Sequence, residues 1–421
     1  MFDRNEPKKR VWILNHYANL PGMGASLRHF NLAKELAKQG YAPRVFASSA
    51  MHNSDSNVIP GRQSWIGRVE EGVDFTYVRT SGYSGNGLAR GINILQYCLR
   101  VPCVARRQRE RFGRPDVIIA SSMHPFALFV GLWMARAYKC KYIAEIRDLW
   151  PESLAAYYPD FNKGLMSVFY RAEKYIYKNA DKVIFTMAGG RDYVADKGWL
   201  GEVDEGKLHH INNGVDLCAF VVNRDSSRLY DPDLADGEAF KAVYTGSVRR
   251  VNNLAMLVEA AAVLKAQGRD DIKILVWGEG GDREALSKEA AQRGLGNIVF
   301  KGYVDKKYIP YIVSQADVNI LHQAVETKIY KYGTSQNKKF DYLAAGRPIL
   351  CTVPSNFDIV AEGGAGVSLE TQTPEAISEA LVRFRDMDPD EYSRYCANAA
   401  TVAEEYDFAK LADRLIDIIE S

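Results

Sequence analysis

The chain has 421 residues, with 54 Lys and Arg, 52 Asp and Glu and a net charge of +2. This length favours two or three domains, and 47% hydrophobic residues are enough for separate cores. No apolar run approaches the roughly 20 residues of a membrane-spanning helix, and the polar start, Met1–Arg10, has no apolar signal core, so we expect a cytoplasmic protein.

Charge and cysteine placement add two expectations. Residues 1–220 contain 30 Lys and Arg against 21 Asp and Glu, a net +9, whereas residues 221–421 contain 24 against 31, a net −7. We therefore expect only the first half to meet an anionic surface. The six cysteines are scattered without a C-x-x-C pair, which predicts reduced, mostly buried thiols and neither a metal site nor a disulfide framework.

The chain begins with a predicted β-α-β unit. Val11–Leu14 predicts a strand, Leu27–Gln39 a helix and Pro43–Ser48 the next strand, which is the repeating unit of a doubly wound sheet. The loop after the first strand contains Gly22 and Gly24, which let backbone approach a ligand. Any tight turn between a strand and a helix also favours glycine, so the two residues alone leave both explanations open.

A basic helix follows an excursion, His52–Asp74, that we predict to be irregular. The helix spans Leu88–Arg111 with a kink before Pro102 and mixes leucine and isoleucine with arginine. Helices of this kind bind anionic lipid, although a solvated helix face packed on the domain is the alternative. Nucleic acid is not favoured, because no aromatic-basic module accompanies the charge. The arginines are Arg100, Arg106, Arg107, Arg109 and Arg111.

Strands and helices continue to alternate through the rest of the first half. The predicted strands are Asp116–Ser122, Lys141–Glu145 and Lys182–Thr186, and the predicted helices are Phe126–Tyr138 and Lys163–Asn179. Arg147 and Asp148 come directly after a strand, at the edge where open α/β sheets bind ligands. Residues 217–238 are polar and lack periodicity, so we expect a linker between domains there.

The second half repeats the alternating pattern, and its most informative stretch is Tyr330–Leu350. A polar loop becomes a helix around Lys338, the helix ends at Gly346, and a buried strand follows. A helix N-terminus with Asn337 and Lys338 suits an anionic ligand, and Asp341, one turn further, is placed to accept hydrogen bonds from two sugar hydroxyls. A capped helix before a core strand is the alternative. The other strands are expected at 242–244, 272–277 and 298–301, and the last helices at 374–384, 390–406 and 408–419.

The run N-K-x-x-D-Y-x-x-x-G-R-P that begins at Asn337 resembles the donor-site helix of family 4 retaining glycosyltransferases. Gly278–Gly281 and Ile211–Asp216 are similar to two further family motifs. The wider family has glutamates at the positions of Gly333 and Asp341, whereas a branch of bacterial surface-polysaccharide transferases, some proposed to move N-acetyl-L-fucosamine, resembles this chain at both. Residues 145–152 are similar to that branch's H-D-L-W-P segment with Arg147 in place of His. Residues 245–253 match its loop at Gly246 and Asn252 but have Val248 where the branch often has His.

The resemblance implies the GT-B fold, in which two Rossmann-like domains face each other across a cleft and the C-terminal helix crosses back to the first domain. We place an acceptor-side domain at 1–220, a nucleotide-sugar domain at 221–400 and the crossing helix at 401–421. The implied reaction is retaining transfer from a nucleotide-diphosphate sugar, with UDP expected, to a polysaccharide or an undecaprenyl-diphosphate-linked acceptor. Together with the basic helix 88–111, this predicts an enzyme bound peripherally to the inner face of the cell membrane.

The resemblance also implies roles for individual residues. Lys338 with Arg249 or Arg250 is expected to clamp the leaving diphosphate, and Arg147 to lie near the transferred sugar. No D-x-D pair follows a strand, so we expect neither a metal nor another cofactor. The expected donor-binding residues are Gly24, Gly246, Ser247, Asn252, Gly278, Val304, Asn337 and Asp341, and the expected acceptor-side residues are Gly22, Arg28 and Asp148.

Two other functions remain open on sequence grounds. A UDP-sugar 2-epimerase shares this fold but needs acidic and histidine residues gathered at its site, and the sequence shows no such arrangement of its histidines. A catalytically silent module that binds nucleotide-sugar is favoured by the missing Glu at Gly333 and the missing His at Arg147. The histidines considered are His16, His124, His209, His210 and His322.

Overall fold

The computed structural model describes residues 7–24, 26–51, 56–83, 85, 87–122, 124–157, 161–324 and 328–421, and the elements below are those of the described residues. The chain forms two compact domains. The first contains residues 1–212 and 411–421, and the second contains residues 213–410. By the charges of their residues the first domain carries +8 and the second −6, so the uneven charge follows the domains.

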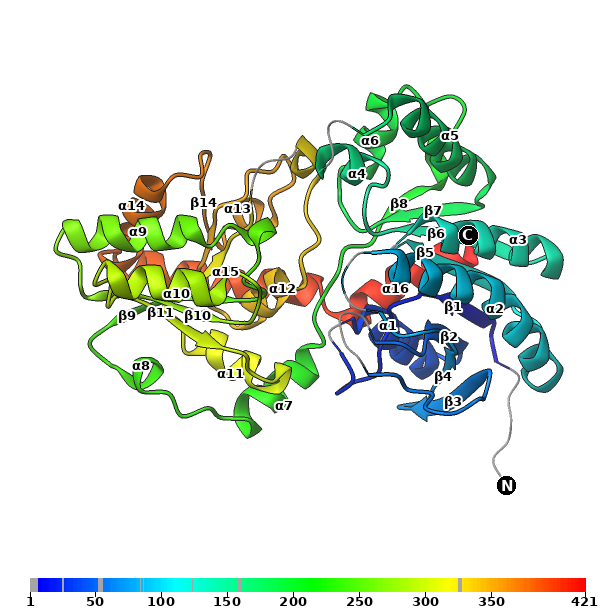
Figure 1. Cartoon of the computed structure of the whole chain (residues 1–421), viewed down its shortest axis with the longest axis horizontal. Coiled ribbons are helices and arrows are strands. Elements are labelled where there is room, and N and C mark those ends of the chain that lie inside the picture. Colours follow the sequence, from blue (N-terminus) through cyan, green and yellow to red (C-terminus); the bar gives the residue numbers. More distant parts are fainter. Residues whose placement is uncertain are drawn as a thin grey trace. The chain divides into compact units, whose positions relative to one another are not determined.

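The first domain is built on a sheet with the strand order β3-β4-β2-β1-β5-β6-β7-β8 (Figure 1). Neighbouring strands are parallel except β3, which pairs antiparallel with β4. The inner strands are buried along almost their whole length, as expected for parallel strands with helices on both faces. The strands are β1 (Arg10–Leu14), β2 (Ala42–Ser48), β3 (Trp65–Glu70), β4 (Val73–Val78), β5 (Val117–Ser122), β6 (Lys141–Ile146), β7 (Lys182–Phe185) and β8 (Leu208–His210).

The helices of the first domain pack on this sheet and on one another. Helix α3 packs on β5 and β6 and lies between α2 and α5. The last helix belongs to this domain from Leu411 onward, although it lies nearly 200 residues beyond the other elements in sequence. The helices are α1 (Arg28–Lys38), α2 (Leu88–Phe112), α3 (Pro125–Tyr138), α4 (Glu152–Tyr157), α5 (Lys163–Asn179), α6 (Gly190–Asp196) and α16 (Phe408–Glu420), with a 3₁₀ turn, η1, at Glu205–Lys207.

The second domain has a parallel sheet with the order β11-β10-β9-β12-β13-β14. Helices α9 and α14 pack against each other over one side of β10, and their apolar residues form the largest core cluster described for this domain. The strands are β9 (Phe240–Thr245), β10 (Ile272–Trp277), β11 (Ile298–Gly302), β12 (Val318–Leu321), β13 (Ile349–Cys351) and β14 (Gly366–Ser368). The helices are α7 (Leu217–Ser226), α8 (Pro232–Ala235), α9 (Ala255–Ala266), α10 (Arg283–Gln292), α11 (Ile309–Ser314), α12 (Asn337–Ala344), α13 (Ile359–Glu362), α14 (Pro374–Arg385) and α15 (Pro389–Glu405), with 3₁₀ turns η2 (Arg250–Asn252), η3 (Lys306–Tyr308) and η4 (Lys328–Tyr332).

Several sequence expectations about local structure are wrong. The predicted linker 217–238 contains α7 and α8, because Asp216 caps α7 by accepting from Ala219 N at 3.0 Å and Phe220 is buried in a core cluster. The boundary expected at 220/221 therefore falls inside a helix, and residues 401–405 of the expected crossing helix belong to α15. The excursion predicted to be irregular contains β3, while residues 52–55 lie outside the described residues.

The cysteine expectation is also wrong in part. All six cysteines are free, as expected, but only Cys351 is buried. Cys103 and Cys218 are exposed, and the others are half-buried. Cys103 is exposed because α2 turns its other side, with Tyr97, Val101 and Val104, to the domain.

Candidate functional site

The sheet of the second domain has its switch point between β9 and β12. The strand order runs outward from β9 in one direction and from β12 in the other, so the loops after these two strands diverge and leave room for a ligand at the carboxyl edge. The loop after β9 begins at Gly246, and β12 is followed by His322. These residues mark the edge at which a ligand is expected.

Close backbone contacts fix the loops at this edge. Gly246 N donates to Trp277 O at 2.9 Å, and a Cβ added at Gly278 would lie 1.7 Å from Gly246 O. Gly278 also has a φ of +149°, so only glycine fits between the two loops. The glycine predicted as donor-binding at 278 therefore brings the loops after β9 and β10 into contact.

The ammonium of Lys338 lies at the same switch point. Its Nζ donates to His322 O at 3.2 Å and lies 4.0 Å from the centre of the Tyr244 ring, and a Cβ added at Gly246 would be 3.4 Å from it. Burial lowers the pKa of Lys338 to about 7. Within the described part of the chain it has no carboxylate partner, so two N–H groups remain to bind an anion.

His322 holds Lys338 through its backbone carbonyl, and its imidazole is not placed for proton transfer because both ring nitrogens are hydrogen-bonded. Its Nε2 faces the carbonyl of Asn253 at 3.1 Å and must donate, so its Nδ1 accepts from Thr352 Oγ1 at 2.7 Å. Burial lowers the pKa of His322 to about 4, with the nearby Lys338 acting in the same direction and the hydrogen bond to Asn253 O opposing it. The imidazole is therefore neutral and both nitrogens are occupied.

Helix α12 presents Lys338 and Asp341 on one side, because residues three apart are neighbours on a helix surface. Burial raises the pKa of Asp341 and the cation Lys306 opposes the rise. Asn337 is the first residue of the helix and is exposed. Lys338 and Asp341 thus lie on one face of α12, and their roles as cation and hydroxyl acceptor stay predictions.

The position of Gly333 explains one departure from the wider family. Its φ is +95°, a conformation that a side chain with Cβ rarely adopts, and its N–H donates to Tyr330 O at 3.0 Å. A glutamate here would strain this turn. The chain therefore holds the loop before α12 in a conformation that favours glycine.

The remaining residues predicted on the donor side have different surroundings. Asn252 Nδ2 donates to Ser247 O at 2.7 Å and to Ser247 Oγ at 2.6 Å, so this pair closes the loop after β9. Arg249 and Arg250 are exposed at the start of η2, and Arg249 lies against Gly280. Val304, after β11, is half-buried against a core cluster. Val248 is fully buried in a core cluster.

In the first domain Gly22 and Gly24 lie in the loop after β1. Gly22 has a φ of +78° and nothing lies within 4 Å of a Cβ added there, whereas a Cβ at Gly24 would meet the amide of Asn19 at 2.4 Å. The loop is closed by Asn19 N, which donates to Ser26 O at 3.1 Å. Gly22 is therefore open to a ligand and Gly24 is packed; Ala25 lies outside the described residues.

Arg28, expected to contact an acceptor, has a buried guanidinium instead. Its Nε donates to Glu145 Oε1 at 2.8 Å, and its NH2 donates to Ile211 O at 2.9 Å. Glu145 also accepts from His29 Nε2 at 2.6 Å. Burial opposes the ionisation of Glu145, but Arg28 and His29 outweigh it and hold its pKa well below the usual range. Arg28 therefore joins α1, β6 and the segment after β8 and does not face solvent.

Arg147 and Asp148 lie at the carboxyl end of β6, as predicted. The backbone of Arg147 is held on both sides, because its N–H donates to Ser122 Oγ at 2.9 Å and its carbonyl accepts from Thr186 Oγ1 at 3.2 Å. Its side chain is half-buried, and burial lowers the pKa of its guanidinium. Asp148 is exposed. The two side chains extend from a fixed strand end.

A histidine pair that sequence analysis did not assign lies at the switch point of the first sheet, between β1 and β5. His124 Nε2 and His16 Nδ1 are 2.8 Å apart, and His16 Nε2 is 2.6 Å from Asn93 Oδ1. Asn93 donates its amide to Ser81 O, so its oxygen must accept and His16 must donate. His124 then donates to His16 and accepts from Ala127 N. Burial lowers the pKa of His124 to about 4, so this imidazole is neutral, and the hydrogen-bonded pair fixes the strand ends.

Signals for the histidine pair were present in the sequence. His16 and His124 follow the buried strands β1 and β5, so strand-end placement alone would have selected them, whereas His322 follows the four-residue strand β12, which is too short to be predicted. Tyr244 carries no such signal, because an aromatic residue within a strand is usually core.

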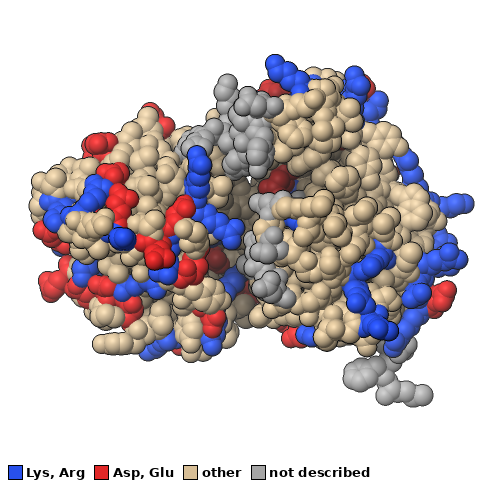
Figure 2. Space-filling view, viewed as in Figure 1, with Lys and Arg blue, Asp and Glu red and all other residues tan. Residues whose placement is uncertain are grey.

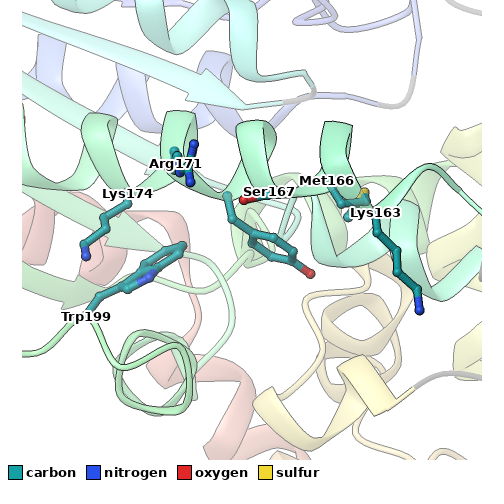
Figure 3. Close-up of a pocket in the computed structure, with 7 residues that line it drawn as sticks. Lys163, Met166, Ser167, Arg171, Lys174 and Trp199 are labelled. Atoms are coloured by element: carbon teal, nitrogen blue, oxygen red, sulfur yellow. The ribbon is translucent and has the colours of Figure 1, made fainter.

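The described residues contain neither a metal-binding cluster nor a membrane-spanning helix, but they do form a cavity away from the predicted site. In the described ranges no group of three or more His, Cys, Asp and Glu side chains is arranged to hold a metal ion, and metal independence stays a prediction. No helix there has the length and apolar character needed to cross a bilayer. Figure 3 shows a pocket of about 420 Å³ along α5, with Lys174 beside Trp199 at one end and Lys163 at the other. It contains none of the predicted site residues.

Two protein-family models match the chain: Glycosyltransferase Family 4 over residues 24–218 and Glycosyl transferases group 1 over residues 239–386. An uncharacterized glycosyltransferase of Methanocaldococcus jannaschii is 22% identical over 225 residues, 53% of this chain and 54% of the relative, so the match spans about half of that relative. Sucrose-phosphate synthase from Thermosynechococcus elongatus has a similar structure, with 15% identity, a TM-score of 0.72 and 98% of both chains covered. Anabaena HepE in complex with UDP and glucose is similar at 14% identity, a TM-score of 0.64 and coverage of 98% of this chain and 100% of that one.

These matches define the class of protein. The two family models, one over each domain, indicate a glycosyltransferase of the family 4 type. The likeness to the two solved structures over nearly the whole chain gives the fold, which is GT-B, so the predicted fold class is confirmed.

Proposed function

We propose that this chain is a retaining glycosyltransferase that moves a sugar from a UDP-activated donor to a polysaccharide or lipid-linked acceptor in bacterial surface-glycan synthesis. One observation carries the proposal: the Lys338 ammonium lies at the switch point of the second sheet, beside Gly246, with Asp341 on the same side of α12. Glycosyl transfer places growing negative charge on the leaving diphosphate, and a fixed cation there stabilises the transition state.

The proposed roles follow from this placement. Lys338, with Arg249 or Arg250, binds the diphosphate, and Asp341 accepts from the ribose hydroxyls. The positive charge of Lys338 takes the place of a metal ion. Arg147, at the end of β6, contacts the transferred sugar, and Asp148 contacts the acceptor. UDP as the nucleotide is supported by the similar HepE structure in complex with UDP and glucose, and the surface-glycan role by the branch-like motifs around Gly333 and Arg147.

An assay of purified protein distinguishes the candidate functions. UDP release that requires an acceptor, with the anomeric configuration retained in the product, supports the proposal. A changed UDP-sugar formed without acceptor identifies an epimerase instead. Binding of UDP-sugar with neither product, across a panel of lipid-linked acceptors, identifies a silent module.

Nucleotide preference gives a direct prediction. UDP at about 100 times its dissociation constant contributes about 2.7 kcal/mol, which for a domain of this size raises the melting temperature by roughly 5–10 °C. A thermal-shift panel with UDP, GDP, ADP and CMP measures this. Stabilisation by GDP or CMP with none by UDP contradicts the assignment of the donor.

The membrane part of the proposal is supported by the orientation of α2. If the helix were an ordinary packed helix, its leucines would face the domain, yet the buried residues include Asn93, Tyr97 and Gln108. Four large apolar residues point outward instead, spaced 4, 3 and 4 residues apart on one face. Their exposed fractions are 83% for Leu88, 45% for Ile92, 58% for Leu95 and 65% for Leu99.

The basic charge of the first domain also favours contact between the apolar face of α2 and anionic lipid. Figure 2 shows Lys and Arg side chains gathered over the part of the first domain that α2 forms, with few acidic residues among them. Helix α3, which packs beside α2, adds exposed apolar residues, Phe126 at 56% and Trp133 at 60%. A face with aromatic, apolar and basic residues is typical of proteins that lie on anionic lipid. We therefore propose that the enzyme works at the inner face of the cell membrane.

Replacing Leu95 and Leu99 together by glutamine is expected to weaken binding to anionic vesicles at least tenfold. Each leucine loses apolar area that the lipid would bury, at about 25 cal/mol per Å². Sedimentation with vesicles measures the change. The matched control replaces Val221 and Val222, which are 42% and 58% exposed on α7 of the acidic domain, and should bind as the wild type does. Equal sedimentation of all three proteins would show that α2 is a solvated face.

A further inference from the structure

The first domain contains a second cavity, of about 560 Å³, that the proposed function does not use. It lies between the segment after β2, the residues that follow β4 and one side of α2. Four of its twelve lining residues are arginines, and none of the twelve, all described, is acidic. The arginines come from three separate segments: Arg62 from the first, Arg79 from the second, and Arg100 and Arg107 from the helix.

The charges of these arginines are not neutralised within the described residues. No carboxylate is within ion-pair distance of any of the four, and the two hydrogen bonds their guanidinium groups make are to neutral groups. Arg100 donates to Arg79 O at 2.8 Å, and Arg107 lies 3.5 Å from Ser64 Oγ. The pocket along α5 differs, since its Lys174 pairs with Glu202 at 2.5 Å. Four like charges around one cavity repel each other, and a bound anion removes that cost.

The chemistry of the lining selects the kind of anion. Guanidinium groups bind phosphoryl oxygens through paired N–H donors, and several of them suit a group with more than one negative charge. The cavity adds the neutral donors Ser64 and Asn57 and has a volume within the usual range for small-ligand sites.

The exposed apolar face of α2 leads into this cavity. Leu95 and Leu99 stand one helical turn apart, and the next position on that face, Cys103, is itself exposed and lines the cavity. A ligand with a phosphoryl head and a hydrocarbon chain would therefore place its head among the arginines and its chain along the leucines.

We propose that this cavity is a binding site for the diphosphate head group of a polyprenyl lipid. The inference deepens the proposed function, because it assigns a place in the first domain to the anchor of a lipid-linked acceptor. It depends on that function only for the identity of the lipid. The binding test below uses no sugar donor, so its failure and the failure of glycosyl transfer are distinguishable.

The test compares farnesyl diphosphate with inorganic diphosphate by isothermal titration calorimetry on the full chain carrying Lys338→Met, which weakens the competing diphosphate site in the second domain. Farnesyl diphosphate is expected to bind at least tenfold more tightly than inorganic diphosphate. The double variant Arg62→Gln/Arg79→Gln should weaken its binding at least tenfold. Neither of these side chains forms an ion pair with a described residue, so the fold should remain intact, which circular dichroism checks.

The control Arg106→Gln/Arg109→Gln removes the same charge from exposed positions outside the cavity and should change binding less than twofold. Equal losses in both double variants would mean that general surface charge binds the probe and would overturn the site. If inorganic diphosphate binds as tightly as farnesyl diphosphate, the cavity serves a soluble phosphate and the lipid assignment fails.

Discussion

Replacing Lys338 by methionine is expected to lower the turnover number of glycosyl transfer by about 100- to 1000-fold, the usual effect of removing one preorganised donor at a site of developing charge. Methionine keeps most of the aliphatic stem over the Tyr244 ring while removing the ammonium that lies beside Gly246 and His322. The fold should therefore survive. Initial rates at saturating donor measure the loss.

Lys339 provides the matched comparison. It is the next residue of α12, but it is buried and its Nζ bonds to Thr334 Oγ1 at 2.7 Å, away from the switch point. Lys339→Met should lower the melting temperature while retaining UDP binding, the reverse of the effect at Lys338. A Lys338→Met protein that turns over at the wild-type rate would remove the lysine from the mechanism and leave α12 a structural element.

The pKa of Lys338 adds a pH dependence with a definite sign. Because burial lowers this pKa to about 7, the side chain is mostly neutral at pH 8 in the free protein. A bound diphosphate favours the charged form, so UDP binding at pH 8 should take up close to one proton, and affinity should fall as pH rises above 7. Calorimetry in two buffers of different ionisation enthalpy measures the uptake. Lys338→Met should abolish it.

Replacing Arg28 by alanine is expected to destabilise the first domain by about 3–5 kcal/mol, because it leaves the buried carboxylate of Glu145 without its strongest partner. For a domain of this size the melting temperature should fall by roughly 6–20 °C. Calorimetry measures the transition. The control is Arg191→Ala, which breaks an exposed pair with Glu205 in the same domain and should cost less than about 1 kcal/mol.

The stability that Arg28→Ala removes should also depend on pH. The folded pKa of Glu145 is depressed, so its contribution to stability is present above its unfolded pKa and is lost as the pH falls through that value towards the folded one. The Arg28→Ala protein should lose less stability on acidification than the wild type, because it has less of this contribution. Equal acid sensitivity of the two proteins would show that the pair does not control the pKa of Glu145.

Much of the fold could be predicted from the periodicity of apolar residues and from the positions of glycine and proline. Helix α2 and strand β10 have the bounds that their apolar patterns indicate to within a residue, and Gly346, with a φ of +60°, ends α12 as expected. Short elements could not be found in this way. Strand β12 has four residues, too few for a period to show, and α7 is stabilised by a cap and one buried phenylalanine.

The sequence by itself determined the alternation of strands and helices in each half and the placement of Lys338 and Asp341 on one side of a helix, because these depend on neighbours within about four residues. It also determined the separation of charge between the halves, which follows from composition alone. The tertiary structure alone decided what each side chain meets. It buried Arg28 against Glu145, 117 positions away, joined His16 to His124, turned the leucines of α2 outward, and gathered four arginines from three segments around one cavity. Contacts of that kind depend on which strands lie side by side and on which face of a helix is covered, and no local pattern specifies either.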